Sequence, residues 1–181
     1  MRVRGARISY YDSPVGRFWF AFNRKGVFAA SLRDRATFLS WLAARGVEAS
    51  PRPAGMPGQL EAELDAYFSG QPVEFEAPIW FAWGTDFQRA VWEVVRSIPY
   101  GQTRSYSWVA ERVGRPRACR AVGAALKANP ILLLVPCHRV VRADGSLGGF
   151  SPGLEVKEWL LRHEGALQGQ RQRSQGRMGR R

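Results

Sequence analysis

Cysteine is scarce in this chain: only Cys119 and Cys137 occur among its 181 residues. Two thiols can build neither a disulfide-rich scaffold nor a zinc finger. In a reducing compartment both cysteines are expected to stay free. The composition therefore predicts a fold that depends on its hydrophobic core and contains no metal site.

Long apolar runs are also absent. No segment approaches the roughly 20 apolar residues that cross a membrane. The opening residues, MRVRGARISYYDS, lack the apolar core of a signal peptide. We therefore expect a soluble, cytoplasmic protein without a membrane partner.

Acidic residues are few relative to basic ones. Lys and Arg number 27 and Asp and Glu number 15, so the net charge is +12. Such an excess fits a polyanionic partner, either nucleic acid or an acidic membrane surface. Hydrophobic residues make up 45% of the chain, and its length suits one compact domain or two small ones.

The first part of the chain has the pattern of β-strands followed by helices. Residues 7–32 form strand-like segments around the turns DSPVG and NRKG, which is typical of a β-meander. A helix is expected over RATFLSWLAARG, ending at Gly46, and a Pro/Gly-rich loop over 49–58. Residues 71–84 are expected to be an extended connector. One face of a second helix, QLEAELDAYFSG, carries Leu60, Leu64, Tyr67 and Phe68.

From residue 85 onward the pattern is helical. Thr85 and Gln88 fit a capping box. SYSWVAERVG and the segment 116–127 are two short helices joined by GRP, a helix-turn-helix pattern. RADGSLGGF supplies turn residues for a hairpin or a wing, and the basic tail 166–181 is expected to be disordered. The first helix of this part carries an apolar stripe of Phe87, Val91, Val94, Val95 and Ile98. The last, GLEVKEWLLRHEG, is expected to bury Val156, Trp159 and Leu160.

The segment 116–127 has two unlike faces. The face expected to pack on the core carries Ala118, Ala121, Val122, Ala125 and Leu126. The opposite face carries Cys119, Arg120, Gly123 and Lys127. Small residues let a helix approach the sugar-phosphate walls of a minor groove, where sequence readout is poor. The segment fits an ordinary amphipathic helix with a solvated basic face equally well, so both interpretations stay open.

A thiol, an imidazole and a guanidinium lie side by side in the otherwise apolar run LVPCHRVV. A thiolate is the best nucleophile among side chains, and a histidine can take its proton directly or through a water. On an extended strand Cys137 and His138 would point to opposite sides unless Pro136 bends the chain. Glu164 is a candidate to orient His138. An inert core thiol is the alternative, but Arg139 favours a polar network because an isolated buried arginine is costly.

Several motifs, in this order, resemble the O6-alkylguanine-DNA alkyltransferases, also called methylated-DNA–protein-cysteine methyltransferases. They are IPYGQTRSY, RAVGAALKANP, VPCHRVV and GGF followed by KEWLLRHEG, within residues 85–165. YYDSPVG gives a looser match in the N-terminal part. The resemblance implies a ribonuclease-H-like α/β domain in 1–80, with a small antiparallel sheet plus helices. It also implies a mostly α, winged helix-turn-helix domain in 81–165, before the tail.

The resemblance also implies roles for individual residues. Cys137 would accept the alkyl group, and His138 would act as its base through a water. Glu164 would orient His138, and Asn129 would brace the turn between the recognition helix and the active site. The implied base pocket consists of Phe150, Ser151, Pro136 and the backbone of Val140.

The implied contacts with DNA come from the helix-turn-helix. Arg120 would fill the gap that a flipped nucleotide leaves, and Tyr106 would push the backbone. Further contacts would come from Cys119, Ala121, Gly123 and Lys127. The lesion base must leave the stack, because its alkyl carbon lies inside the duplex.

The activity implied is repair of O6-alkylguanine, and of O4-alkylthymine, in double-stranded DNA. The alkyl group would move to Cys137 once, without a cofactor, because a thioether offers no leaving group for regeneration. A monomer is expected, near the nucleoid if the source is prokaryotic. Phe150 stands where some relatives have tyrosine, and the N-terminal half has no spare Cys or His for the zinc that some carry.

Two other functions stay open at this point. One is a lesion-binding module without chemistry, against which Cys137 argues. The other is a winged-helix regulator with an incidental cysteine. A regulator would explain the basic charge but not the combination of Cys137, His138, Glu164 and Asn129.

Overall fold

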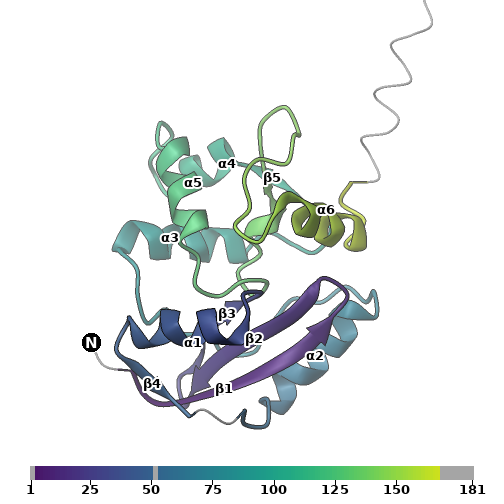
Figure 1. The fold of residues 1–181 in the computed structure, drawn as a ribbon. Helices are drawn as coiled ribbons and strands as arrows, with labels where there is room; N and C mark the ends of the chain where they lie inside the picture. The colour runs from purple at the N-terminus through teal and green to yellow at the C-terminus, as the bar shows by residue number, and fades with distance from the viewer. Residues whose placement is uncertain (1–2, 51–52, 168–181) are drawn as a thin grey trace, which may run out of the picture.

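The computed structural model describes residues 3–50 and 53–167, so the expectation of a disordered tail falls almost entirely outside the described residues. A small β-sheet with two helices forms the N-terminal part, here called the sheet part (up to residue 85). A group of helices forms the helical part, from residue 86 onward (Figure 1). This order confirms the expected fold class. No helix in the described ranges is long and apolar enough to span a membrane.

The sheet has the strand order β3-β2-β1-β4. β1 (Val3–Ser13), β2 (Gly16–Asn23) and β3 (Gly26–Ser31) form the expected antiparallel meander. β1 starts earlier than expected because its first residues pair in parallel with the short strand β4 (Val47–Ala49).

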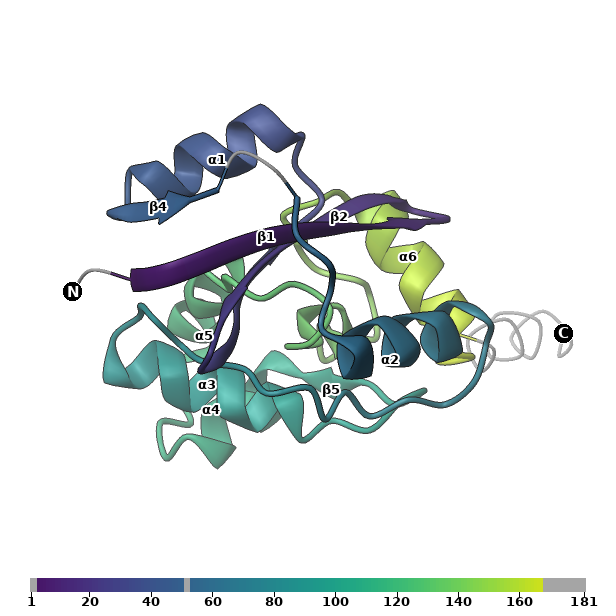
Figure 2. The ribbon, with the colours of Figure 1, turned by 90° about the horizontal axis from the view of Figure 1, so that it is seen from below.

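Alternate side chains of β2 face opposite sides of the sheet. Trp19 and Ala21 pack in one core with α1 (Arg35–Ala43), whereas the three phenylalanines of β2 pack in another with α2 (Gly58–Phe68). Figure 2 shows α1 and α2 on opposite sides of the strands. The core on the α2 side continues into the helical part without a break, so apolar packing holds the two parts together.

The helical part contains the expected helices around a shared core. Its elements are α3 (Asp86–Arg96), β5 (Arg104–Ser105), α4 (Tyr106–Arg112), α5 (Cys119–Lys127), the 3-10 helix η1 (Cys137–Arg139), β6 (Val140–Val141) and α6 (Leu154–His163). Thr85 and Gln88 form the expected capping box of α3. Trp92, which the expected stripe omitted, is buried and donates from Nε1 to the Ala125 carbonyl at 2.8 Å. This bond fixes α3 against α5.

The expected start of the second helix of the helix-turn-helix is wrong in detail, and of the two forms expected for the wing segment the hairpin is not formed in the described part of the chain. α5 begins at Cys119, because the preceding residues form a turn closed by the Ala118 amide on the Arg115 carbonyl. The wing segment closes a turn between Arg142 and Ser146, but within the described ranges it forms no paired hairpin strands. The wing is therefore a loop.

The buried faces of α5 and α6 also differ from expectation. Ala121 is exposed, because the buried face of α5 follows Val122, Ala125 and Leu126. In α6, Leu160 is buried as expected, but Val156 and Trp159 are only half-buried. Lys157 is buried instead.

Candidate active site

The Cys137 thiol lies at the start of a 3-10 turn, which is the bend that Pro136 was considered to allow and not an extended strand. Pro136, with φ −78° and ψ 62°, leads the chain into this turn. The Cys137 residue is only 6% exposed. Asn129, just after α5, holds the turn. Its Nδ2 donates to the Val135 carbonyl at 3.1 Å and to Cys137 Sγ at 3.3 Å, and its Oδ1 accepts from the Ile131 amide at 2.9 Å.

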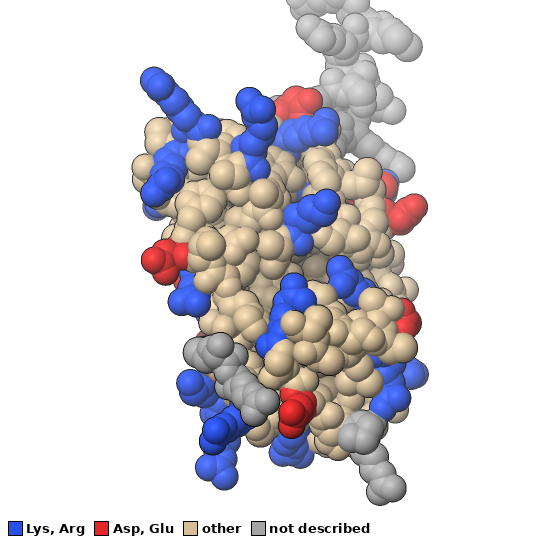
Figure 3. Space-filling model, turned by 60° about the vertical axis from the view of Figure 1, so that its left-hand side comes forward, with Lys and Arg blue, Asp and Glu red and all other residues tan. Residues whose placement is uncertain are grey.

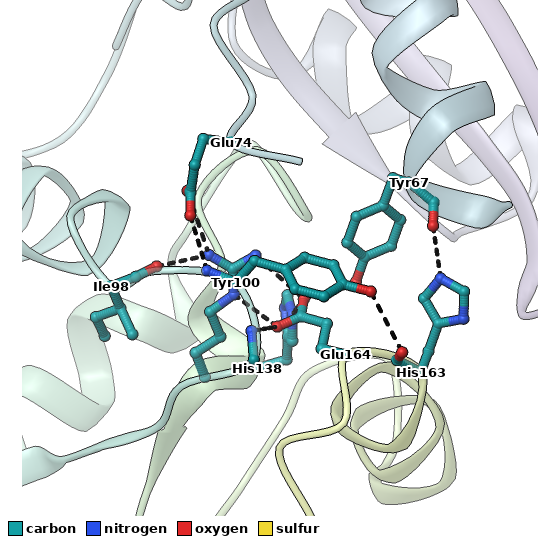
Figure 4. A network of polar contacts seen from close by, with 9 residues as sticks. Tyr67, Glu74, Ile98, Tyr100, His138, His163 and Glu164 are labelled. Carbon is teal, nitrogen blue, oxygen red and sulfur yellow. Dashed lines mark hydrogen bonds and ion pairs between the residues drawn. The ribbon is translucent and has the colours of Figure 1, made fainter. Parts of the chain in front are cut away.

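The Glu164 carboxylate, just after α6, accepts five hydrogen bonds at the centre of a buried network (Figure 4). Oε1 accepts from the Tyr67 hydroxyl at 2.7 Å and lies 2.6 Å from His138 Nε2. Oε2 accepts from Arg139 Nε at 2.9 Å and from the Gly101 amide at 3.2 Å. Burial alone would raise the pKa of Glu164, but the charges and hydrogen bonds of His138 and Arg139 lower it to about 2. The carboxylate is therefore ionised at neutral pH.

Arg139 supplies the permanent positive charge of this network. It is 2% exposed, and its Nη1 also donates to the Ile98 carbonyl at 2.6 Å and lies 3.8 Å from Glu74 Oε2. An arginine inside an apolar run implied such a network, and the structure contains it. Breaking a buried pair of this kind leaves an uncompensated charge, which is strongly destabilising.

The buried His138 ring is positioned to accept a proton. Its Nε2 faces Glu164, whereas its Nδ1 has no hydrogen-bond partner among the described residues. Because the carboxylate only accepts, Nε2 carries the hydrogen and Nδ1 keeps its lone pair. Burial lowers the pKa of His138, and the opposing influence of Glu164 does not reverse the shift. The ring is therefore neutral at neutral pH and basic at Nδ1.

The protonation of the Cys137 thiol depends on opposing influences. Burial raises its pKa above the ordinary value, while the hydrogen bond from Asn129, the charge of Lys157 and the backbone amides of Cys137 and His138 act in the opposite direction. Burial prevails. A thiol in this state needs a proton acceptor when it reacts.

Lys157 reaches the active site from α6. Its Nζ donates to the Val140 carbonyl at 2.6 Å and to the Leu147 carbonyl, so it joins β6 to the wing loop. Burial lowers the pKa of Lys157 to about 8, against the charge of Cys137, which raises it. Lys157 thus holds the loop that carries Phe150 and places a titratable cation near the thiol.

A cavity of about 590 Å³, here called the α5 cavity, opens beside Cys137. Gly148, with φ +68°, permits a close approach there, since a Cβ would lie 2.7 Å from the Tyr106 hydroxyl. Ser151 Oγ donates to the Lys127 carbonyl at 3.4 Å. The expected site residues in its wall are Tyr106, Cys119, Arg120, Gly123, Lys127, Cys137, Phe150 and Ser151. A chamber of this kind suits a flat ring held next to a thiol.

Of the residues expected to contact DNA or to line the base pocket, three lie outside this wall. Ala121 is exposed but does not border the α5 cavity. Pro136 lines a different cavity, together with Glu74 and Arg139. Val140 is buried, and its carbonyl accepts from Lys157. For Pro136 and Val140, which flank the 3-10 turn, the turn is the reason: it brings Cys137 to the wall of the α5 cavity and leaves its two flanking residues outside.

Sequence reasoning missed three contributors to the site. Tyr67 was placed only on an apolar helix face, and neither Lys157 nor Gly101 was given a role in the site. The Gly101 amide reaches Glu164 because the residue has φ +73° and no Cβ, which would lie 2.9 Å from the Glu164 carbonyl oxygen. For Tyr67 the sequence did contain a signal. A tyrosine on an otherwise apolar helix face is expected to be buried, and a buried hydroxyl needs a hydrogen-bond partner.

No cluster of His, Cys, Asp and Glu side chains in the described part of the chain could hold a metal ion. The chemical groups of the site are thus a thiol, a neutral imidazole, an ionised carboxylate and two buried cations. Such a set can remove a proton from sulfur and stabilise the charge that results.

Family models and curated relatives match the chain along most of its length. The model of the 6-O-methylguanine DNA methyltransferase, DNA binding domain, matches residues 86–166, and that of its ribonuclease-like domain matches 6–81. The methylated-DNA–protein-cysteine methyltransferase of Salmonella typhimurium is 41% identical over 159 residues, covering 86% of this chain and 93% of that protein. The protein of that name from Mycobacterium leprae is 40% identical over 156 residues, covering 84% and 88%.

Solved structures of O6-methylguanine methyltransferases are also similar to this chain along most of its length. The O6-methylguanine methyltransferase of Mycobacterium tuberculosis aligns with a TM-score of 0.76 and 35% identity, covering 89% of this chain and 93% of that one. A Mycobacterium tuberculosis relative solved in complex with DNA aligns with a TM-score of 0.77 and 36% identity, covering 88% and 93%.

Proposed function

The chain belongs to the 6-O-methylguanine DNA methyltransferase family, and we propose that Cys137 is its alkyl acceptor. Its activity is that of a methylated-DNA–protein-cysteine methyltransferase, and DNA is its partner. We assign O6-alkylguanine in double-stranded DNA as its substrate, with O4-alkylthymine as a second lesion. The chain would act as a cytoplasmic monomer without a cofactor.

The orientation of His138 is the observation that carries this proposal. Glu164 holds Nε2, which leaves the buried Nδ1 with its lone pair and without a hydrogen-bond partner among the described residues. A water between Nδ1 and Sγ would pass the Cys137 proton to His138. Glu164 and Arg139 would then stabilise the imidazolium without taking its proton. Asn129 keeps Sγ in place during this step.

The reaction is a displacement at the alkyl carbon. A bond forms between Cys137 Sγ and that carbon, and the bond from the carbon to guanine O6 breaks. The electron pair of the broken bond stays on the guanine, which takes up the proton that the thiol lost. The products are guanine and an S-alkyl cysteine, so each chain acts once.

The walls of the α5 cavity support a role in holding the extruded base. Phe150 and Tyr106 offer apolar surface, and Arg120 lies at the exposed side of α5. We assign Arg120 to the gap in the stack and Tyr106 to the backbone of the flipped nucleotide. Unstacking the base costs a few kcal/mol, which these contacts would offset.

Mass spectrometry tests the proposal directly. Incubation with duplex DNA that carries O6-methylguanine should add one methyl group per chain, located on Cys137 by peptide mapping. Cys137→Ser should gain no mass but still bind DNA, because a hydroxyl is a far weaker nucleophile under the same base. Cys119→Ser, which changes the other thiol to a hydroxyl of similar size, is the matched control and should still gain one methyl group on Cys137. Multiple turnovers, or label on Cys119, would contradict the assignment.

A further inference from the structure

A second cavity reaches Cys137 from the junction of the two parts. This junction cavity has a volume of about 600 Å³ and is lined from both sides. Arg33 and Arg45 contribute from the sheet part, and Lys127 contributes from α5. Among the described residues in its wall there is no Asp or Glu. The junction cavity is therefore a cationic cleft without an internal counter-charge.

The two arginines form a like-charged pair. Neither Arg33 nor Arg45 forms an ion pair with any described residue, so their charges are not neutralised within the described chain. Burial, and then the charge of Arg33, lower the pKa of Arg45. The Arg45 guanidinium is held in position, since it lies 4.0 Å from the centroid of the Trp41 ring and Nη1 donates to the Trp41 carbonyl at 3.2 Å. An anion in the cleft would relieve this repulsion.

The junction cavity adjoins the α5 cavity. Lys127, Cys137, Phe150 and Ser151 border both of them. Figure 3 shows Lys and Arg side chains above and below a hollow on one face of the molecule, with few acidic side chains between them. A strand that delivers a base to Cys137 therefore passes the rim on which the two arginines lie.

We propose that Arg33 and Arg45 bind the sugar-phosphate backbone of the damaged strand beside the flipped nucleotide. The sheet part then shares in DNA binding, across the cleft from the helix-turn-helix. This inference rests on the proposed function, because it takes the base to lie in the α5 cavity.

The dimensions of the cleft suit this occupant. A compact space of this volume is roughly 8 Å wide, and one strand of a duplex carries a charge about every 3.4 Å along the axis. Two or three phosphates would therefore lie within the cleft. A guanidinium matches a phosphate with paired donors, which favours arginine at such positions.

The salt dependence of DNA binding tests the inference. Each phosphate contact contributes roughly 0.9 to the slope of log affinity against log salt concentration, so Arg33→Gln with Arg45→Gln should lower the slope by about 1.8. The control is Arg4→Gln with Arg24→Gln, because these two exposed arginines border neither cavity and remove the same charge. The control should change the slope clearly less. Arg45→Lys keeps the charge and should retain most of the slope.

Neutral phosphate analogues locate the contacts. A methylphosphonate is placed at single positions within about three nucleotides of the lesion, in the range set by the charge spacing. At the contacted position it should weaken binding by the unaltered protein but not by the double arginine variant. Equal weakening of both proteins at every position would overturn the proposal. So would a salt slope that falls equally in the test and control variants.

The inference and the proposed function can fail separately. Methylation of Cys137 by O6-methylguanine DNA tests the function, whatever the arginines do. Reaction with free O6-benzylguanine, which has no phosphate, distinguishes DNA binding from support of the thiol. If the rate of alkyl transfer by the double arginine variant fell by the same factor with the free base as with DNA, the arginines would support the active site and not bind the DNA backbone.

Discussion

The Tyr67 hydroxyl donates to the same oxygen of Glu164 that faces His138. Tyr67 belongs to α2 in the sheet part and lies 97 residues before Glu164. Burial, together with the charge of Glu164, raises the pKa of Tyr67, so the hydroxyl stays protonated and always donates. The sheet part thus contributes a hydrogen bond to the network that orients His138.

Tyr67→Phe should change the pH dependence of alkyl transfer. Without the hydroxyl, Oε1 of Glu164 interacts more strongly with His138, which raises the pKa of the imidazole. The acidic limb of the rate profile with O6-benzylguanine should therefore move to higher pH, and unfolding should cost about 1–3 kcal/mol less. Tyr100→Phe is the control, because that hydroxyl donates to the His163 carbonyl at 3.3 Å and not to Glu164. If the variant lost stability but the acidic limb of its rate profile stayed at the same pH, Tyr67 would support only the fold and would not tune His138.

Glu164→Gln should slow alkyl transfer much more than it weakens lesion binding. The amide cannot stabilise the imidazolium that forms on His138, and it leaves Arg139 without its partner. The expected loss of stability is about 3–5 kcal/mol, so rates are best measured in the cold. His138→Asn, which keeps the Arg139–Glu164 pair, removes the base with a smaller effect on folding. Equal falls in rate and affinity in both variants would contradict a role in proton transfer.

The Glu164 network should also be visible in acid denaturation. The pKa of Glu164 is lowered from 4.5 to about 2 in the folded chain. Its ionised form therefore stabilises the fold above pH 4.5, and this contribution is lost as the pH falls from 4.5 to 2. The difference in unfolding free energy between the parent and Glu164→Gln should narrow across that window. If the difference in unfolding free energy stayed constant from pH 6 to pH 2, ionisation of Glu164 would not be coupled to folding.

Lys157→Met should affect both the wing loop and the thiol. The variant keeps an unbranched side chain of nearly the same length but loses the bonds to the Val140 and Leu147 carbonyls and the charge that favours the Cys137 thiolate. The pH at which the Cys137 thiol ionises should therefore move to higher values. The pKa of Lys157 is lowered in the folded chain from 10.5 to about 8, so the parent should gain stability relative to the variant between pH 8 and 10.5. Parallel stability profiles would contradict a buried, titrating lysine.

Arg120→Ala should separate flipping from chemistry. Arg120 is exposed on α5 beside the small residues Cys119 and Gly123, at the wall of the α5 cavity. Repair of duplex DNA should slow strongly, because extruding a paired base costs a few kcal/mol. Reaction with free O6-benzylguanine should hardly change. The measurement is the second-order rate constant of the parent and of the variant with each of the two substrates. Equal losses with both substrates would assign Arg120 to the pocket.

Local patterns in the sequence predicted most of the fold. The meander, the capping box at Thr85 and the helix-turn-helix each depend on neighbouring residues, and each is present. The sequence left open whether Pro136 bends the chain at Cys137, because three polar residues between two apolar flanks are compatible with a strand and with a 3-10 turn. The exposure of Ala121 depends on where α5 starts, which a proline at 116 does not fix.

The catalytic set was only partly visible in the sequence. The proximity of Cys137 and His138 is local, and Arg139 indicated that a counter-charge must be near. Tyr67, Gly101 and Lys157 reach the site across long separations, through packing that no periodicity encodes. Their bonds are compelled by burial, since a hydroxyl, an amide and an ammonium group without water must find protein partners.

The bond between Tyr67 and Glu164 links a protein that reacts only once to the packing of its two parts. Tyr67 comes from the sheet part, whereas Cys137, His138 and Glu164 come from the helical part. Only when the helical part has docked on α2 does His138 gain its full set of neighbours. A molecule whose two parts are not packed together therefore lacks part of the network around His138. The single reaction of each copy thus requires the fully folded protein.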